Sequence, residues 1–148
     1  MLFERELHQA TQGAERGTEV RLVALAGAQI AGFVNLSEIA RGVFQNAYAS
    51  WAVNAALAGR GYATEGVSAL LDFAFTSEAQ GGLGLHRVQA NIIPANARSI
   101  RLAERVGFRR EGLALRYLRI AGEWQDHALY ATTAEERPGG GVFPPPPR

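Results

Sequence analysis

A glycine-rich turn, Leu57-Ala58-Gly59-Arg60-Gly61-Tyr62-Ala63-Thr64, leads from a β-like run directly into the most regular helical pattern of the chain. From Thr64 to Ser77, apolar residues recur at i, i+3, i+4, i+7 and i+8: Val67, Leu70, Leu71, Ala74 and Phe75. This spacing predicts an amphipathic helix with one continuous apolar stripe. The glycines allow a close approach of backbone to a ligand, and the first amides of a helix lie unpaired at the positive end of its dipole. The turn is therefore a candidate phosphate or diphosphate site, although a tight turn without a ligand would use the same glycines.

Regular patterns on either side of this turn predict a mixed α/β fold. Before it, the sequence predicts a helix from Phe3 to about Gln12, a hairpin of Glu19–Leu25 and Ile30–Leu36, and a strand at Ala47–Val53. After it, the sequence predicts a strand at Arg87–Ile93, a helix at Ala97–Val106 ended by Gly107, and strands at Leu113–Ile120 and His127–Thr132 around the turn Ala121-Gly122-Glu123. This order indicates helices packed on a largely antiparallel sheet.

The composition indicates one domain and excludes several kinds of chemistry. The chain has 148 residues, which fits a single folded domain over residues 1–136 followed by a Gly/Pro-rich tail over residues 137–148. It contains no Cys and no Lys, which excludes disulfides, thiolate catalysis and lysine Schiff bases. His8, His86 and His127 lack metal-ligand spacing, so we expect no metal.

The net charge and the lengths of the apolar runs indicate which partners and which cellular compartment to expect. A net charge of +1 gives no electrostatic reason to expect binding to nucleic acid or to a membrane. We find neither a signal peptide nor an apolar run of about 18 residues. We therefore expect a soluble, cytoplasmic protein, and the sequence leaves open whether it forms a homodimer.

Two common phosphate motifs do not fit the glycine turn. A Walker P-loop ends in Gly-Lys-Ser/Thr, and this chain has no Lys. A dinucleotide fingerprint needs a third glycine where Thr64 stands and an acidic residue about twenty positions on, whereas Asp72 and Glu78 both come too early. The ligand must therefore be identified in another way.

A series of spaced motifs resembles the GNAT family of N-acetyltransferases. The sequence Arg60-Gly61-Tyr62-Ala63-Thr64-Glu65 before an amphipathic helix is similar to the acetyl-CoA-binding motif of that family. Leu85-His86-Arg87-Val88-Gln89-Ala90-Asn91, Pro94-Ala95-Asn96-Ala97-Arg98-Ser99, Arg105-Val106-Gly107-Phe108 and Glu111-Gly112 resemble the ribosomal-protein-alanine N-acetyltransferases of the RimJ/RimL type. Gly122-Glu123-Trp124-Gln125-Asp126-His127 looks most like the RimJ side. The resemblance covers about residues 20–133.

The resemblance implies a particular fold, with two departures from the family pattern. It implies a mixed, largely antiparallel sheet with helices on both faces, in which the strand before the glycine turn splays from its neighbour. Ala58 stands where the family usually has Gln or Arg, so one side-chain contact to the diphosphate is missing. Family members usually carry a strand and a helical segment before the region of Phe3, which help to wall the acceptor site, and we expect both to be missing here.

The resemblance also implies direct acetyl transfer from acetyl-CoA to a primary amine. The implied cofactor-binding residues are Trp51, Ala52, Val53, Gly59, Arg60, Gly61, Tyr62, Ala63, Thr64 and Asn96. Ser99 is the implied acid that protonates the departing thiolate, although it could equally be an ordinary helix residue. Asn96 is also a natural N-cap for the helix that follows. No carboxylate stands where some relatives have a base, in Arg116-Tyr117-Leu118-Arg119.

Three functions remain open for the acceptor side. A protein α-amine, with a reference pKa near 8, is already partly neutral at physiological pH and needs no dedicated base. The first hypothesis is therefore acetylation of the N-terminal α-amine of a protein, in particular a ribosomal protein. The second is acetylation of a small amine such as a polyamine, amino acid or aminoglycoside, and a polyamine would favour an acidic pocket. The third is a non-catalytic CoA-binding module.

Overall fold

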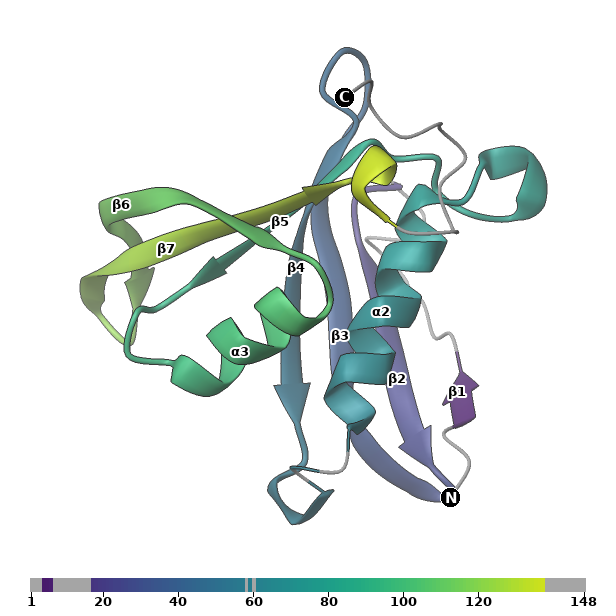
Figure 1. Cartoon of the computed structure of the whole chain (residues 1–148), viewed down its shortest axis with the longest axis horizontal. Helices are drawn as coiled ribbons and strands as arrows, with labels where there is room; N and C mark the ends of the chain where they lie inside the picture. Colours follow the sequence, from purple (N-terminus) through teal and green to yellow (C-terminus); the bar gives the residue numbers. More distant parts are fainter. Residues whose placement is uncertain (1–3, 7–16, 58, 60, 138–148) are drawn as a thin grey trace.

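The computed structural model describes residues 4–6, 17–57, 59 and 61–137, and within them one seven-stranded sheet carries two helices (Figure 1). The strands are β1 (Glu4–Glu6), β2 (Val20–Ala26), β3 (Gln29–Ala40), β4 (Asn46–Val53), β5 (Arg87–Ile92), β6 (Arg109–Ile120) and β7 (Glu123–Thr133). The helices are α2 (Tyr62–Phe75) and α3 (Ala97–Arg105), and short 3₁₀ turns lie at Ala55–Leu57, Glu78–Gln80 and Ala134–Glu136. The order across the sheet is β1-β2-β3-β4-β5-β7-β6. Among the strands that the structure describes, only β4 and β5 pair in parallel, which confirms the largely antiparallel sheet.

The core forms because the apolar stripe of α2 meets the alternating apolar residues of the central strands. The five stripe residues are each at most 1% exposed: Val67, Leu70, Leu71, Ala74 and Phe75. They belong to one cluster with residues of β2, β3, β4 and β5, including Leu22, Leu36, Ala47 and Val88. The predicted helix is therefore confirmed together with its buried face, and its first turn is held against the sheet.

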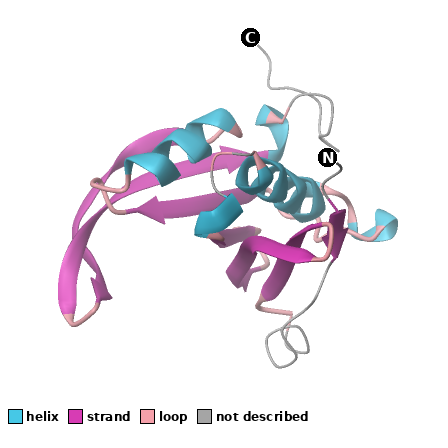
Figure 2. Cartoon of the chain, turned by 90° about the horizontal axis from the view of Figure 1, so that it is seen from below, coloured by secondary structure: helices cyan, strands magenta, loops and turns pink. Residues whose placement is uncertain are grey.

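Both described helices pack on the same face of the sheet (Figure 2). On β4, Ala47 and Ala49 point into the core shared with α2, and Trp51, next on that side, contacts Ser99 of α3. On the opposite face, Asn35 Nδ2 of β3 donates to Ser50 Oγ of β4 at 3.5 Å. In the described residues the apolar sides of α2 and α3 join a single cluster, so both helices cover one face of the sheet.

The first predicted helix is wrong at its start. Glu4–Glu6 forms β1, which pairs antiparallel with Val23–Leu25 of β2. A helix as short as the one expected here is marginal without packing, whereas the outer edge of β2 offers unpaired backbone groups to an extended segment. The rest of the predicted helix, from residue 7 to 12, lies outside the described residues.

The last two strands are longer than expected and form a twisted hairpin. Each begins four residues before its predicted start, at Arg109 and Glu123. The turn consists of Ala121 and Gly122, both with positive φ, which is the geometry of tight two-residue hairpins. A register irregularity in β6 places Arg116 at φ 48°, and its amide donates to Asp126 Oδ1 at 2.8 Å.

An ion-pair cluster on the sheet joins β5 to β6. Glu111 accepts hydrogen bonds from Arg87 and from Arg109, the latter at 2.6 Å. The hydrogen bond from Arg109, opposed by partial burial and aided by the charge of Arg87, holds the pKa of Glu111 below its usual value. A carboxyl group whose pKa is lower in the folded state stabilises the fold at pH above its unfolded pKa, and this stability is lost as the pH falls through the folded pKa.

Substitution Glu111→Gln tests this linkage. We expect the variant to lose about 1 kcal/mol of unfolding free energy at most near pH 7, because the pair is partly exposed to solvent. The difference from the wild type should shrink as the pH falls below the usual carboxyl pKa near 4.5. Urea titrations of both proteins between pH 3 and 7 measure it, and a difference independent of pH would contradict the assigned charge interaction.

Candidate functional site

The sheet opens between β4 and β5, directly before the glycine turn. The two strands pair only from Asn46 to Tyr48, with Arg87 to Gln89 as partners, and diverge beyond. A cavity of about 510 Å³ lies in this gap, and we call it the sheet-opening cavity. Its lining comes from Ala49, Ser50, Trp51, Ala90, Asn91, Ile92, Ile93, Ala95, Asn96, Ser99, Ile120 and His127. The splayed strands implied by the resemblance are therefore present, and they leave backbone groups of both strands available to a ligand.

The glycine turn presents the start of α2 to a second cavity. Gly59 and Gly61 both adopt φ +82°, a left-handed conformation that side chains disfavour. Gly61 is the N-cap of α2, no side chain caps the helix, and the first intrahelical bond runs from Glu65 N to Gly61 O at 3.0 Å. The amides of Ala63 and Thr64 therefore have no intrahelical acceptor, which is the arrangement that favours a phosphate group.

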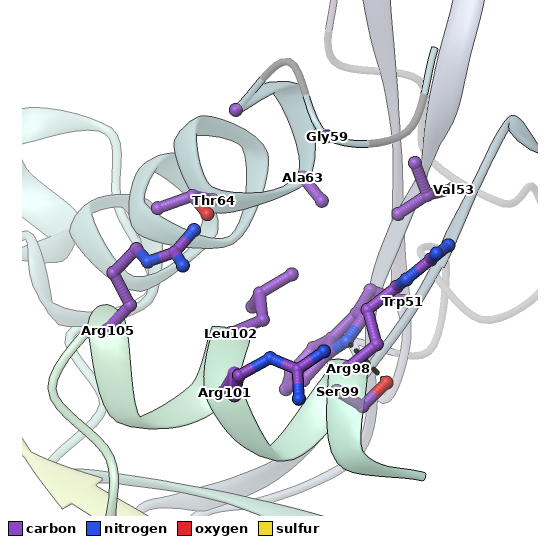
Figure 3. Close-up of a pocket in the computed structure, with 11 residues that line it drawn as sticks. Trp51, Val53, Gly59, Ala63, Thr64, Arg98, Ser99, Arg101, Leu102 and Arg105 are labelled. Carbon is purple, nitrogen blue, oxygen red and sulfur yellow. Dashed lines mark hydrogen bonds between the residues drawn. The ribbon is translucent and has the colours of Figure 1, made fainter. Parts of the chain in front are cut away.

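This second cavity lies between α2 and α3 and has a volume of about 380 Å³ (Figure 3). We call it the α2–α3 cavity. Its lining consists of Trp51, Val53, Gly59, Gly61, Ala63, Thr64, Arg98, Ser99, Arg101, Leu102 and Arg105. Trp51 and Ser99 line both cavities, so the two cavities meet at this pair of side chains. The arrangement is a path from the start of α2 to the opened sheet.

Ser99 is held in place at the junction. Trp51 Nε1 donates a hydrogen bond to Ser99 Oγ at 3.3 Å, shown as a dashed line in Figure 3. The Ser99 amide donates to Asn96 Oδ1 at 3.2 Å, which makes Asn96 the predicted N-cap of α3. Trp51 also packs against Phe108, with ring centroids 6.1 Å apart. Because Ser99 Oγ accepts from the indole, its own hydroxyl proton is left to donate elsewhere.

His127 of β7 lines the sheet-opening cavity. The side chain is buried, with 3% of the residue exposed, and among the described residues that line this cavity it is the one titratable group. Its Nδ1 lies 2.9 Å from the carbonyl oxygen of Gln125. A carbonyl can only accept, so Nδ1 carries the proton and, in the neutral ring, Nε2 carries the lone pair.

The structure brings together most of the site residues expected from the sequence. Eight of them line one or both cavities: Trp51, Val53, Gly59, Gly61, Ala63, Thr64, Asn96 and Ser99. Two others lie elsewhere. Ala52 and Tyr62 are absent from the lining of both cavities, and the Tyr62 side chain is buried in a small cluster with Leu57. Arg60, like Ala58, lies outside the described residues.

Sequence reasoning missed three arginines of α3. Arg98, Arg101 and Arg105 line the α2–α3 cavity, opposite the glycine turn. Their spacing of i, i+3 and i+7 places them on one side of a helix, and this pattern was visible in the predicted Ala97–Val106 segment.

Within the described part of the chain, no group of three or more His, Asp or Glu side chains could hold a metal ion. No helix in that part is long and apolar enough to cross a membrane.

Comparisons with known proteins agree with this geometry. The family described as "Acetyltransferase (GNAT) domain" matches residues 2–109. The probable N-acetyltransferase YjcK of Bacillus subtilis is 37% identical over 103 residues, which are 70% of this chain and 54% of that protein. The ribosomal protein uS5-alanine N-acetyltransferase of Escherichia coli is 37% identical over 112 residues, which are 75% of this chain and 55% of that protein. The chain thus spans about half the length of these curated relatives.

A solved structure shows the same fold. RimJ of Mycobacterium smegmatis in complex with CoA-disulfide superimposes with a TM-score of 0.81 and 33% identity, covering 88% of this chain and 60% of that one. The resemblance to the RimJ type noted in the sequence is therefore confirmed. With the family match over most of its length and the splayed sheet beside a glycine turn, the chain belongs to the GNAT family of acetyltransferases.

Proposed function

We propose that the chain transfers an acetyl group from acetyl-CoA to the N-terminal α-amine of a protein, in particular a ribosomal protein. One observation carries the proposal: a phosphate-type site at the start of α2 is joined, through Trp51 and Ser99, to an opening in the sheet. Relatives acetylate amines, and the uS5-alanine enzyme of E. coli supports a ribosomal protein as acceptor.

The donor is expected to lie along the α2–α3 cavity. The amides of Ala63 and Thr64, at the positive end of α2, are suited to the diphosphate. The backbone of Trp51 and Val53, on the strand that leaves β5, is suited to the amides of the pantetheine arm. The binding of CoA-disulfide by the M. smegmatis structure supports this ligand class.

The chemical step requires a proton donor and a proton acceptor on opposite sides of the thioester. The amine nitrogen attacks the carbonyl carbon, a C–N bond forms, the C–S bond breaks and the sulfur leaves as a thiolate. We assign the proton for the thiolate to the hydroxyl of Ser99, which takes up a proton from solvent in its turn, so that the serine ends neutral. The proton from the amine passes to water or to Nε2 of His127, whose tautomer is set by the Gln125 carbonyl.

The lining of the sheet-opening cavity distinguishes between acceptors. Its polar side chains are Ser50, Asn91, Asn96, Ser99 and His127, and no carboxylate is present among its described lining residues. A polyamine carries several positive charges and would be recognised best by carboxylates. The cavity therefore favours a single amine group over a polyamine.

A turnover assay tests the proposal. We expect release of CoA from acetyl-CoA with peptides that begin with alanine, and little release with spermidine or with the same peptides blocked at the N-terminus. Mass spectrometry should place the added 42 Da on the α-amine, the mass of an acetyl group in place of a hydrogen. Binding of CoA without turnover on any acceptor would instead support a non-catalytic CoA-binding module. Turnover only on small amines would show that the acceptor is a small amine and not the α-amine of a protein.

A further inference from the structure

Three arginines form a row along the α2–α3 cavity. Arg98, Arg101 and Arg105 of α3 all line it, and Figure 3 shows them on the side that faces the start of α2. Arg105 points toward Thr64, whereas Arg98 extends toward Val53. No acidic side chain is among the residues described in the lining of this cavity.

The row carries positive charge that the described chain does not neutralise. Other arginines form ion pairs, such as Arg87 and Arg109 with Glu111 or Arg137 with Asp72. None of the described hydrogen bonds or ion pairs involves the three arginines of the row. Like charges one turn apart on a helix repel each other by a few tenths of a kcal/mol. An anion between them would remove this cost.

The helix dipole explains only one member of the row. Arg105 lies in the last turn of α3, where a positive charge is favourable. Arg98 lies in the first turn and Arg101 in the middle, where the dipole opposes the charge or has little effect. The row is thus not accounted for by the stability of α3.

The proposed donor carries one more anionic group than the start of α2 can hold. CoA has a diphosphate and, separately, a phosphomonoester on the 3′-oxygen of its ribose. The amides at the start of α2 form one site, suited to the diphosphate. Guanidinium groups bind phosphates through paired, charge-assisted hydrogen bonds, and two of them one turn apart can converge on one phosphate.

We propose that Arg101 and Arg105 form a second anion subsite that binds the 3′-phosphate and makes the protein select CoA over 3′-dephospho-CoA. This inference rests on the proposed binding of CoA. Arg101 lies in the middle of α3 and Arg105 in its last turn, whereas Ser99 lies in its first turn, so we expect the two arginines to act on affinity for the donor and not on the chemical step.

Calorimetric titration with CoA and with 3′-dephospho-CoA tests the subsite directly. We expect the wild type to bind CoA about 10- to 100-fold more tightly than 3′-dephospho-CoA. This ratio corresponds to the one or two charge-assisted hydrogen bonds that 3′-dephospho-CoA cannot form. In the double variant Arg101→Ala/Arg105→Ala this ratio should fall to about 1, while the affinity for 3′-dephospho-CoA stays within about threefold of wild type. Arg110→Ala, which removes an exposed arginine of β6 outside both cavities, is the matched control and should keep the full ratio.

The outcomes separate this inference from the proposed function. If the wild type binds both nucleotides equally, the subsite is refuted while CoA binding stands. If the double variant weakens both nucleotides by the same factor, the arginines serve the diphosphate and the subsite is again refuted. If the wild type binds neither nucleotide, the proposed function fails, and this inference fails with it.

Discussion

Substitution Gly61→Glu is expected to weaken CoA binding by about 100-fold or more while the protein stays folded. Gly61 caps α2 and lines the α2–α3 cavity. A side chain here meets no described atom within 4 Å of its Cβ, so it fits without a clash inside the protein. Its carboxylate would stand beside the expected diphosphate, and two unit charges about 4 Å apart repel by about 4 kcal/mol at an effective dielectric constant near 20.

Backbone strain must be separated from this charge effect. Because φ is +82° at Gly61, any other residue costs roughly 1–2 kcal/mol of folding stability. Gly81→Glu introduces the same charge at φ +90°, also with open space around the Cβ, beyond the far end of α2. This control should lose similar stability and keep its affinity for CoA.

Gly61→Ala completes the series, since it adds strain without charge, and we expect it to lose less affinity than Gly61→Glu. Calorimetry with CoA measures binding, and thermal unfolding followed by circular dichroism measures stability. Micromolar affinity retained in Gly61→Glu would show that the start of α2 does not hold the diphosphate.

The sequence was most informative where a local pattern and the tertiary contacts agree. The stripe from Val67 to Phe75 predicted both the existence of α2 and its buried face, because a helix of this length repeats its apolar side several times. Asn96 predicted the start of α3 by a local hydrogen bond, and this bond is present. Such features depend on residues three or four positions apart in the chain.

The features that the sequence missed depend on distant neighbours. Glu4–Glu6 is a strand only because the edge of β2 lies beside it. The first residues of β6 and β7 carry no clear alternation, since much of this hairpin is exposed on both faces, as at Leu115 and Trp124. A strand of this kind is defined by its partner, which a local pattern does not contain.

The residues of the candidate site also fall into these two groups, those that a local pattern predicts and those that depend on distant contacts. The glycine turn was visible because two glycines before a helix have a specific backbone use. Tyr62 was expected at the ligand from its place in the motif, yet its ring fills a space beside Leu57 on the sheet side of the helix. The arginines of α3 acquire a role only when α3 is packed opposite the start of α2, and this packing is set by contacts between residues far apart in sequence.

Ser99→Ala is expected to lower the rate of acetyl transfer by about 10- to 100-fold and to leave CoA affinity within about threefold of wild type. General acid catalysis contributes about 100-fold or more in many enzymes. The effect should be at the lower end here, because a thiol with a pKa near 8.5 is already a fair leaving group. The hydrogen bond from Trp51 Nε1 to Ser99 Oγ polarises the hydroxyl and leaves its proton to the sulfur.

A set of variants distinguishes proton donation from simple packing. Ser99→Thr keeps the hydroxyl and should retain most of the rate. Trp51→Phe removes the indole donor but keeps a ring against Phe108, so we expect a smaller loss than in Ser99→Ala. Ser77→Ala, in the loop after α2, is the matched control and should behave as the wild type.

The rate must be measured in a single turnover, because release of product can limit kcat and hide a change in chemistry. With enzyme in excess over acetyl-CoA, transfer to an alanine-terminated peptide reports the chemical step, and calorimetry reports CoA binding separately. If CoA affinity falls in Ser99→Ala while the single-turnover rate does not, the hydroxyl binds the donor equally in the ground state and in the transition state. If neither changes, the proton of the thiolate comes from solvent, and the junction of the two cavities serves only to orient the thioester.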